Sequence, residues 1–361
     1  MKILFIAGSL NQGGAEFQLL QLAKLFQEHK HDVEVFAITD YNFYRPFIEK
    51  NNIAYFHLNN DQGKFKRVLL TAKKIKITQP DLIVSYLKVP SQVAVFAKYI
   101  SHSRAKLIVG ERTSFIQPLY DCFHFNLMHL ADHLTVNSVV RLKQLQKHFS
   151  FLRNKISFFP NIIDLDAFPY DQKRSQLNSR KIGFVGRIAP EKNIVNLIKA
   201  IKLLTDNNND VQLLLYGDAR NEVYLEKVNS LIAKAKLQDS VVLKGKTDTV
   251  QEAYKNIDLL CLISDYEGFS NVISEALCSG VPVITSDVEE NKYLIENGVN
   301  GFVVNHKDPE SIAEGIEKYL QMDAQSKDKM SKENRKKAEV LFDKDVLYSK
   351  YMAIINELIA E

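Results

Sequence analysis

Short apolar segments alternate with longer amphipathic segments along the first part of the chain. Residues 2–7 (KILFIA) are almost wholly apolar, and after a glycine turn Phe17, Leu20 and Leu25 recur at helical spacing, so a strand precedes a helix. Further runs rich in valine, isoleucine and aromatic residues follow at 31–39, 81–87, 105–110, 133–138 and 155–160. Helical stretches separate these runs, which is the pattern of a parallel sheet with crossover helices.

The same pattern begins again at Lys181. Residues 181–201 (KIGFVGRIAPEKNIVNLIKAI) repeat the order of apolar strand, glycine turn and helix. More strand-like runs follow, separated by helical stretches, at 211–217, 240–245, 257–264, 281–286 and 301–304. This repetition predicts a second Rossmann-like unit.

The length of 361 residues also favours two domains, because a single hydrophobic core stops growing at about 250–300 residues. We therefore predict an α/β protein with two Rossmann-like, doubly wound domains facing a cleft. The predicted parts are an N-terminal domain over 1–163, a linker over 164–180, a C-terminal domain over 181–340 and a C-terminal helix over 341–361. Whether that last helix packs back on the N-terminal domain is left open.

Composition narrows the class of protein. Hydrophobic residues make up 46% and charged residues 25% of the chain, which is ordinary globular usage. Three scattered cysteines do not suggest a disulfide framework, and the first residues lack the pattern of a signal peptide. Since no run approaches the length of a spanning helix, we expect a cytoplasmic protein, with attachment to the cytoplasmic face of the inner membrane left open.

Charge is divided unevenly along the chain. Up to Pro160, lysine and arginine outnumber aspartate and glutamate by 21 to 11, whereas after it they number 26 against 32. A basic half indicates an anionic partner, either a nucleic acid or a membrane surface.

Residues 64–77 (KFKRVLLTAKKIKI) contain six basic residues and no acid, and Phe65, Val68, Leu69, Ala72 and Ile75 recur at helical spacing within them. This segment predicts a basic amphipathic helix. Two interpretations remain open, namely a helix that packs on the sheet with a solvated lysine face and a helix that contacts anionic lipid.

The first glycine turn, Gly8 to Gly14, leads into a helix N-terminus, which is a favourable place for an anion. The turn lacks the lysine and serine or threonine of a P-loop and the G-x-G-x-x-G spacing of a dinucleotide site. Asp164 and Asp166 resemble a metal-binding Asp-x-Asp pair, but their position favours a turn and cap. No metal is predicted.

In the second half, Gly186-Arg187 ends a strand and Lys192 lies five residues beyond the arginine. A guanidinium offers paired donors to a diphosphate and an ammonium adds a point charge, so the two together could hold a leaving nucleoside diphosphate. The alternative is that both are ordinary surface charges.

Residues 264–285 hold two glutamates eight positions apart, Glu267 and Glu275, around a turn that precedes a helix. The first carboxylate could face a reacting sugar and the second could accept bonds from ribose hydroxyls. The turn could place backbone N–H groups toward phosphate or sugar oxygens, and it consists of Gly268, Phe269, Ser270 and Asn271. Two acids near a helix start are also favourable simply because of the helix dipole.

In these residues the chain resembles the large retaining glycosyltransferase family 4, which has the GT-B fold. Arg187 with Lys192 resembles the family's diphosphate motif, and Glu267 with Glu275 resembles its Glu-x7-Glu motif. Gly13 and Gly14 resemble its N-terminal turn near the acceptor and the leaving phosphate. The resemblance runs through nearly the whole chain, and further matches stand at Ala131-Asp132, Pro160-Asn161 and Gly217-Asp218.

The chain departs from the family pattern in two places. Where many relatives carry a histidine that contacts the donor sugar, this chain has Glu111-Arg112-Thr113, and Arg112 is expected to replace that contact. After Gly217-Asp218 it has Ala219-Arg220 in place of the usual Gly-Pro or Gly-Glu.

The resemblance implies transfer of a sugar from a nucleoside diphosphate donor, expected to be UDP-linked, to a lipid-linked or surface-glycan acceptor, with the anomeric configuration retained. Arg187 and Lys192 would neutralise the departing diphosphate, Glu267 would orient the sugar, and Glu275 would hold the ribose. Gly217 would lie at the donor, and Gly13, Gly14, Glu111 and Arg112 at the acceptor or phosphate. No cofactor is expected beyond the donor itself.

Other functions remain open at this stage. An epimerase of the same fold would release a changed sugar without an acceptor, and a non-catalytic scaffold of a polysaccharide assembly complex would bind the nucleotide sugar without turnover. A nucleic-acid partner is not expected, because no recognition helix or aromatic RNA-binding motif is present.

Overall fold

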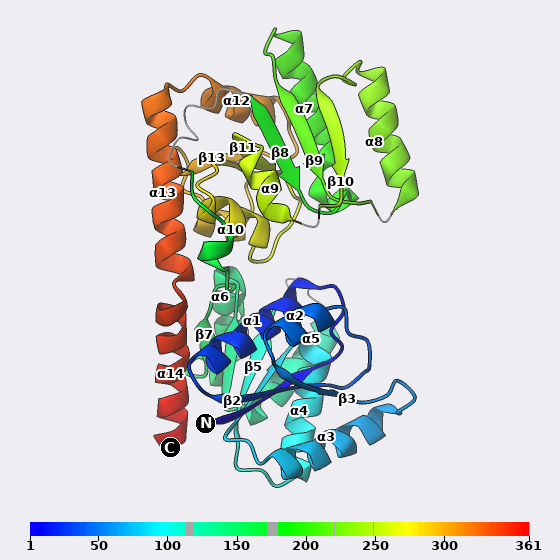
Figure 1. Cartoon of the computed structure of the whole chain (residues 1–361), viewed down its shortest axis with the longest axis vertical. Coiled ribbons are helices and arrows are strands. Elements are labelled where there is room, and N and C mark those ends of the chain that lie inside the picture. The colour runs from blue at the N-terminus through cyan, green and yellow to red at the C-terminus, as the bar shows by residue number, and fades with distance from the viewer. Residues whose placement is uncertain (113–117, 172–179, 220, 248, 361) are drawn as a thin grey trace. The chain divides into compact units, whose positions relative to one another are not determined.

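A computed structural model describes residues 1–112, 118–171, 180–219, 221–247 and 249–360. The chain divides into two compact units (Figure 1). Unit 1 contains Met1–Ile162 and the C-terminal helix α14 (Lys344–Ala360), and unit 2 contains Ile163–Asp343. Of the predicted linker, residues 172–179 lie outside the described residues, as do Thr113 and Arg220.

Unit 1 is built on a seven-stranded parallel sheet with the order β3-β2-β1-β4-β5-β6-β7. Six of these strands are predicted by apolar runs; β3 is not, because it is a short edge strand with largely exposed side chains. The strands are β1 (Lys2–Ala7), β2 (Asp32–Ala37), β3 (Ala54–His57), β4 (Leu82–Tyr86), β5 (Lys106–Glu111), β6 (His133–Val136) and β7 (Ile156–Phe158).

Helices cover both faces of this sheet and form two apolar layers with it. In one layer, α1 and α14 pack against Phe5 and its neighbours. In the other layer, the helices α3, α4, α5 and α6 pack against Leu4 and its neighbours. The helices are α1 (Gly14–Glu28), α2 (Arg45–Lys50), α3 (Lys64–Thr78), α4 (Lys88–Ile100), α5 (Pro118–Leu127) and α6 (Val139–His148).

The predicted basic helix is confirmed as α3, but its predicted apolar face is partly wrong. Ala72 and Ile75 are buried against the sheet, whereas Phe65 is 73% exposed and Leu69 is 42% exposed. The helix carries more apolar residues than its buried stripe can cover. Some of its apolar surface is therefore left in solvent.

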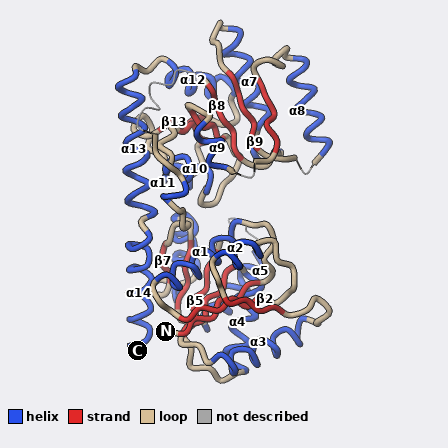
Figure 2. Tube along the Cα trace, viewed as in Figure 1, coloured by secondary structure: helices blue, strands red, loops and turns tan. Residues whose placement is uncertain are grey.

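Unit 2 contains a six-stranded parallel sheet with the order β10-β9-β8-β11-β12-β13. Strands are drawn in red and helices in blue in Figure 2. Its strands are β8 (Lys181–Val185), β9 (Gln212–Tyr216), β10 (Val241–Gly245), β11 (Leu259–Leu262), β12 (Val283–Ser286) and β13 (Gly301–Val304). Its helices are α7 (Ile194–Asp206), α8 (Glu222–Lys234), α9 (Val250–Lys255), α10 (Asn271–Cys278), α11 (Glu289–Leu294), α12 (Pro309–Leu320) and α13 (Ala324–Phe342).

The strand order of unit 2 changes direction between β8 and β11. The chain moves outward from β8 to β9 and β10, and then returns to place β11 on the other side of β8. In doubly wound sheets, ligands bind outside the carboxyl ends of the strands at such a switch point. Arg187 follows β8 and Glu267 follows β11, so the sheet brings the two predicted motifs to this edge.

The predicted α/β architecture with two Rossmann-like sheets is thus confirmed. Among the described residues, no helix is both long and apolar enough to cross a bilayer. Asp164 accepts a hydrogen bond from the Asp166 amide and caps the short helix Leu165–Ala167, as predicted for a turn.

Candidate active site

The carboxyl ends of β8 and β11 bring Lys192 and Glu267 into contact. Lys192 Nζ donates to Glu267 Oε1 at 2.7 Å, and the Ser264 hydroxyl donates to the same oxygen at 2.6 Å. The Asp265 amide also donates to the carbonyl of Glu191 at 2.9 Å, which ties the loop after β11 to the short helix Pro190–Lys192. The lysine and the glutamate are 75 residues apart in sequence, and the switch point brings their side chains together.

Arg187 lies close to this cluster in the chain but is more open to solvent. Its guanidinium is 55% exposed and contacts the Glu191 carboxylate at 3.4 Å. Its position follows from hydrogen bonds between the ends of two strands: the Gly186 amide donates to Tyr216 and the Ile188 amide donates to Asp218. An exposed guanidinium with a single weak ion pair is able to turn toward an anionic ligand.

Gly217 is required by the close approach of these strand ends. It has a φ of +141°, and a Cβ at this position would lie 1.8 Å from the carbonyl oxygen of Gly186. No side chain fits there. The structure therefore gives this predicted donor residue a packing role, whether or not a donor touches it.

In the turn before α10, the side chains of Phe269 and Ser270 mainly stabilise the fold. The Ser270 hydroxyl accepts from the Ile273 amide at 3.3 Å and caps α10, and the buried Phe269 ring packs at its edge against Phe342. Gly268, by contrast, has an ordinary φ and no heavy atom within 4 Å of the place that a Cβ would take. Packing within the described residues therefore does not require glycine at position 268.

Glu275, the second predicted carboxylate, is held by a tyrosine that the sequence did not single out. The Tyr254 hydroxyl donates to Glu275 Oε2 at 2.8 Å, with the Val272 carbonyl 3.1 Å away, and the tyrosine ring packs against Phe168. Burial raises the pKa of Glu275 to about 7, and the bond from Tyr254 opposes that rise. Little in the sequence points to this tyrosine, because its short helix Val250–Lys255 (VQEAYK) is mostly polar and its carboxylate partner lies 21 residues further along the chain.

We expect replacement of Tyr254 by phenylalanine to shift the pH dependence of donor binding. If Glu275 accepts from ribose hydroxyls as predicted, its ionised form is the stronger acceptor, and wild-type affinity should fall as the pH drops through about 7. Without the tyrosine hydroxyl the pKa rises further, and the midpoint should move to higher pH. Calorimetric titration of UDP between pH 5.5 and 9, compared with Tyr293→Phe on α11, measures this; an unchanged midpoint would separate Tyr254 from donor binding.

The predicted residues of unit 1 occupy the first turn and the end of β5. Gly13 caps α1 in an extended conformation, and its carbonyl accepts from the Tyr44 hydroxyl at 2.8 Å. Burial raises the pKa of Glu16 in the first turn of that helix. Gly14 begins α1.

Arg112 and Glu111 both turn toward the interior of unit 1. Arg112 donates to the Tyr86 hydroxyl at 2.8 Å and to the Phe159 carbonyl at 3.3 Å, and its guanidinium lies 4.3 Å from the centre of the Tyr86 ring. It also lies 3.4 Å from the hydroxyl of Tyr351 on α14. Glu111 is buried at 3.7 Å from the equally buried His124. The structure thus gives Arg112 internal partners, and its sugar-contacting role stays a prediction.

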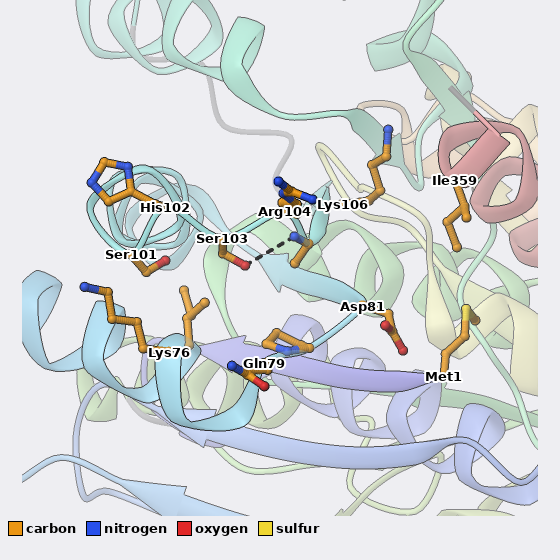
Figure 3. Close-up of a pocket in the computed structure, with 13 residues that line it drawn as sticks. Met1, Lys76, Gln79, Asp81, Ser101, His102, Ser103, Arg104, Lys106 and Ile359 are labelled. Carbon is orange, nitrogen blue, oxygen red and sulfur yellow. Dashed lines mark hydrogen bonds between the residues drawn. The ribbon is translucent and has the colours of Figure 1, made fainter.

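A cavity of unit 1 lies away from all these residues. It has a volume of about 940 Å³ and opens at the amino ends of β4 and β5, where Asp81 and Lys106 lie on its wall (Figure 3). The C-terminal end of α3 contributes Lys76, and α14 contributes Ile359. This is the edge of the sheet opposite to the glycine turn. Among the described residues no cluster of histidine, cysteine, aspartate or glutamate could hold a metal ion.

Comparisons with known proteins agree on the family. Residues 12–167 match the family described as Glycosyltransferase Family 4, and residues 170–337 match the one described as Glycosyl transferases group 1. A Campylobacter jejuni 4-alpha-N-acetylgalactosaminyltransferase, named for a diphospho-undecaprenol-linked substrate, is 26% identical over 93% of this chain and 94% of its own. The Staphylococcus aureus capsular polysaccharide biosynthesis glycosyltransferase CapM is 28% identical, over 56% of this chain and 54% of its own.

Solved structures show the same fold. Anabaena HepE in complex with UDP matches with a TM-score of 0.87 and 21% identity, over 99% of this chain and 100% of its own. Sucrose-phosphate synthase from Thermosynechococcus elongatus matches with a TM-score of 0.81 and 16% identity, over the full length of both chains. With both halves matched and the two Rossmann-like sheets in place, the chain belongs to the GT-B glycosyltransferases, in the family of Glycosyltransferase Family 4 and glycosyl transferases group 1.

Proposed function

We propose that this glycosyltransferase moves a sugar from a UDP-linked donor to a lipid-linked or surface-glycan acceptor with retention of the anomeric configuration. The observation that carries the proposal is the contact of Lys192 with Glu267 at the switch point of unit 2. A cation for the diphosphate lies there beside a carboxylate for the sugar, where a doubly wound sheet binds its ligand. Arg187 adds a second, solvent-accessible cation.

In the proposed reaction, Arg187 and Lys192 stabilise the negative charge that develops on the departing diphosphate. Preorganised charge of this kind acts most strongly on the transition state. It also supplies the positive charge that a metal ion would otherwise provide, so the proposed reaction uses none. Glu267, held by Ser264 and Lys192, orients the sugar, and Glu275 accepts from the ribose hydroxyls.

Retention needs no protein base in this proposal. The leaving diphosphate takes the proton of the acceptor hydroxyl, and the acceptor attacks the sugar on the same face from which the diphosphate departs. In unit 1, Gly13 and Gly14 present backbone amides at the start of α1, where the helix N-terminus favours an anion. We assign acceptor binding to unit 1. Glu111 and Arg112, at the end of β5, would support the acceptor site.

The names of relatives support the substrate class. An Escherichia coli relative, 27% identical over 45% of this chain, is named a UDP-Gal:alpha-D-GlcNAc-diphosphoundecaprenol alpha-1,3-galactosyltransferase. HepE is also known in complex with UDP-glucose. A UDP-sugar donor and an undecaprenyl diphosphate-linked acceptor are therefore the first choices for this chain, and the acceptor would place the enzyme at the cytoplasmic face of the membrane.

A panel of UDP-sugars tests the proposal in the presence of EDTA. One of them should raise the melting temperature in a concentration-dependent way, because a ligand that binds only the folded state stabilises it. The same donor should then be consumed only when an undecaprenyl diphosphate-linked glycan is added, and the product should keep the anomeric configuration of the donor. Conversion of the donor without an acceptor would instead identify an epimerase, and loss of turnover in EDTA would reject the metal-free mechanism.

A further inference from the structure

Two neighbouring helices of unit 1 expose large apolar side chains on their outward faces. On α3 these are Phe65, Leu69 and Ile77, which are 73%, 42% and 68% exposed. On α4, Phe96 and Ile100 are 43% and 41% exposed. The two helices pack against each other and cover the same face of the sheet (Figure 1). Exposed apolar residues that gather in one region mark an interaction surface, whereas single ones are ordinary.

The exposed residues of each helix share one side. On α4, Val89, Phe96 and Ile100 follow one another at intervals of seven and four, so they form a stripe opposite the buried Ala94 and Ala97. On α3 the stripe also contains lysine, because Lys66, Leu69, Lys73 and Ile77 recur at intervals of three and four. We call these stripes together the outer helix surface, which consists of Phe65, Lys66, Leu69, Lys73, Lys76, Ile77, Val89, Phe96 and Ile100.

The chain segment that carries the outer helix surface is strongly basic. Residues 62–110 contain ten lysines and arginines and a single acid, Asp81. The structure pairs Lys74 with Glu34 and Lys98 with Asp132, which ties these two cations to the body of unit 1. Lys66, Lys73 and Lys76 are exposed, and no carboxylate of the described residues forms an ion pair with them. Their charge is available to an external anion.

The mixture of apolar and basic residues decides which partner fits. A solvated helix would expose lysine without phenylalanine and isoleucine, and a nucleic-acid site would not need an apolar stripe. Interfacial helices combine both, because their apolar side chains enter the boundary of headgroups and acyl chains while lysines contact anionic headgroups. The charge of the region is complementary to that of an anionic leaflet.

We propose that the outer helix surface docks unit 1 on an anionic lipid bilayer, with Leu69, Phe96 and Ile100 entering the headgroup boundary and Lys66 and Lys73 contacting lipid phosphates. The inference deepens the proposed function, on which it rests, because a lipid-linked acceptor lies at such a surface. It assigns membrane contact to two helices, whereas the sequence left such contact open for one of them. Partial burial of several apolar side chains, together with the attraction of nearby lysines to anionic headgroups, gives reversible attachment.

Tryptophan fluorescence tests the apolar part of the proposal, because the chain contains no tryptophan. Phe96→Trp places a single fluorophore on the surface, and Val223→Trp places one on α8 of unit 2, where Val223 is 76% exposed. With vesicles of phosphatidylglycerol and phosphatidylcholine, the emission of F96W should shift to the blue and be quenched by brominated acyl chains. The emission of V223W should not change.

Charge reversal tests the basic part. Lys66→Glu with Lys73→Glu should raise the lipid concentration for half-maximal flotation by about tenfold or more. The matched control, Lys227→Glu with Lys234→Glu on α8, makes the same charge change on unit 2 and should have little effect. Residual flotation of the wild type in about 1 M salt, where the Debye length is about 3 Å, measures the apolar contribution.

The outcomes separate this inference from the proposed function. If no vesicle binds while UDP still raises the melting temperature, the outer helix surface is not a membrane site and the proposed function stands. If vesicles bind as described but no UDP-sugar stabilises the protein, the surface stands and the proposed function falls. A blue shift of F96W that depends on protein concentration and not on lipid would reveal contact with a second copy of the chain, and would overturn the proposal.

Discussion

Replacing Lys192 with alanine is expected to lower kcat/KM by about a hundredfold to a thousandfold, the loss that follows removal of one preorganised group that stabilises developing charge. The ammonium has two functions in our proposal, since it faces the diphosphate and also holds Glu267 at 2.7 Å. Without it, the carboxylate keeps only Ser264 as a partner among the bonds described here and loses its fixed orientation.

A second ion-paired lysine of unit 2 provides the control. Lys255 contacts Glu252 at 2.6 Å on α9, where both side chains are about half exposed. Lys255→Ala therefore removes a lysine and breaks a more exposed Lys–Glu pair outside the proposed site, and it should leave kcat/KM unchanged. If both variants keep wild-type activity, Lys192 does not act on the leaving group.

Replacing Arg187 with alanine should lower kcat/KM about tenfold to a hundredfold, because a charge-assisted hydrogen bond contributes about 1.5–3 kcal/mol. The melting temperature should not change, since the guanidinium is 55% exposed and its pair with Glu191 is an exposed contact of little energetic weight. If Arg187 acts on charge that appears only in the transition state, kcat should fall more than the affinity for UDP.

The control variant for Arg187→Ala is Lys202→Ala, which removes a cation from another exposed i, i+4 ion pair, on α7. Steady-state kinetics with saturating acceptor, together with calorimetric titration of UDP, distinguish the effects on kcat and on binding. A wild-type kcat in Arg187→Ala would exclude this residue from the reaction. An equal loss in both variants would point to the net charge of unit 2 instead.

The fold was predictable because both sheets depend on buried, nearly continuous apolar strands. Such runs are visible in the sequence at β1, β4 and β8, and their alternation with helices specifies a parallel sheet. Edge strand β3 escaped notice because exposed positions lack that signal. The apolar face of α3 was assigned too widely because spacing alone cannot tell which apolar residues find a partner in the tertiary structure.

The site was predictable where its motifs lie on one segment. Glu267 and Glu275 were found because their spacing and turn are local in the chain. The partnership of Tyr254 with Glu275 and the shared acceptor of Lys192 and Ser264 depend on which strands become neighbours in the sheet. Sequence order does not contain this information directly. The internal bonding of Arg112 was missed for the same reason, since Tyr351 lies 239 residues further along the chain.

The return of α14 to unit 1 affects the order in which the protein folds during synthesis. Leu347, Tyr351, Ile355 and Leu358 complete an apolar core whose other buried residues come from the first 162. These four side chains leave the ribosome after the whole of unit 2, which is contiguous in the chain. Unit 2 is therefore free to fold while the apolar side of α1 is still uncovered, and the nascent N-terminal half exposes that apolar surface until α14 has emerged.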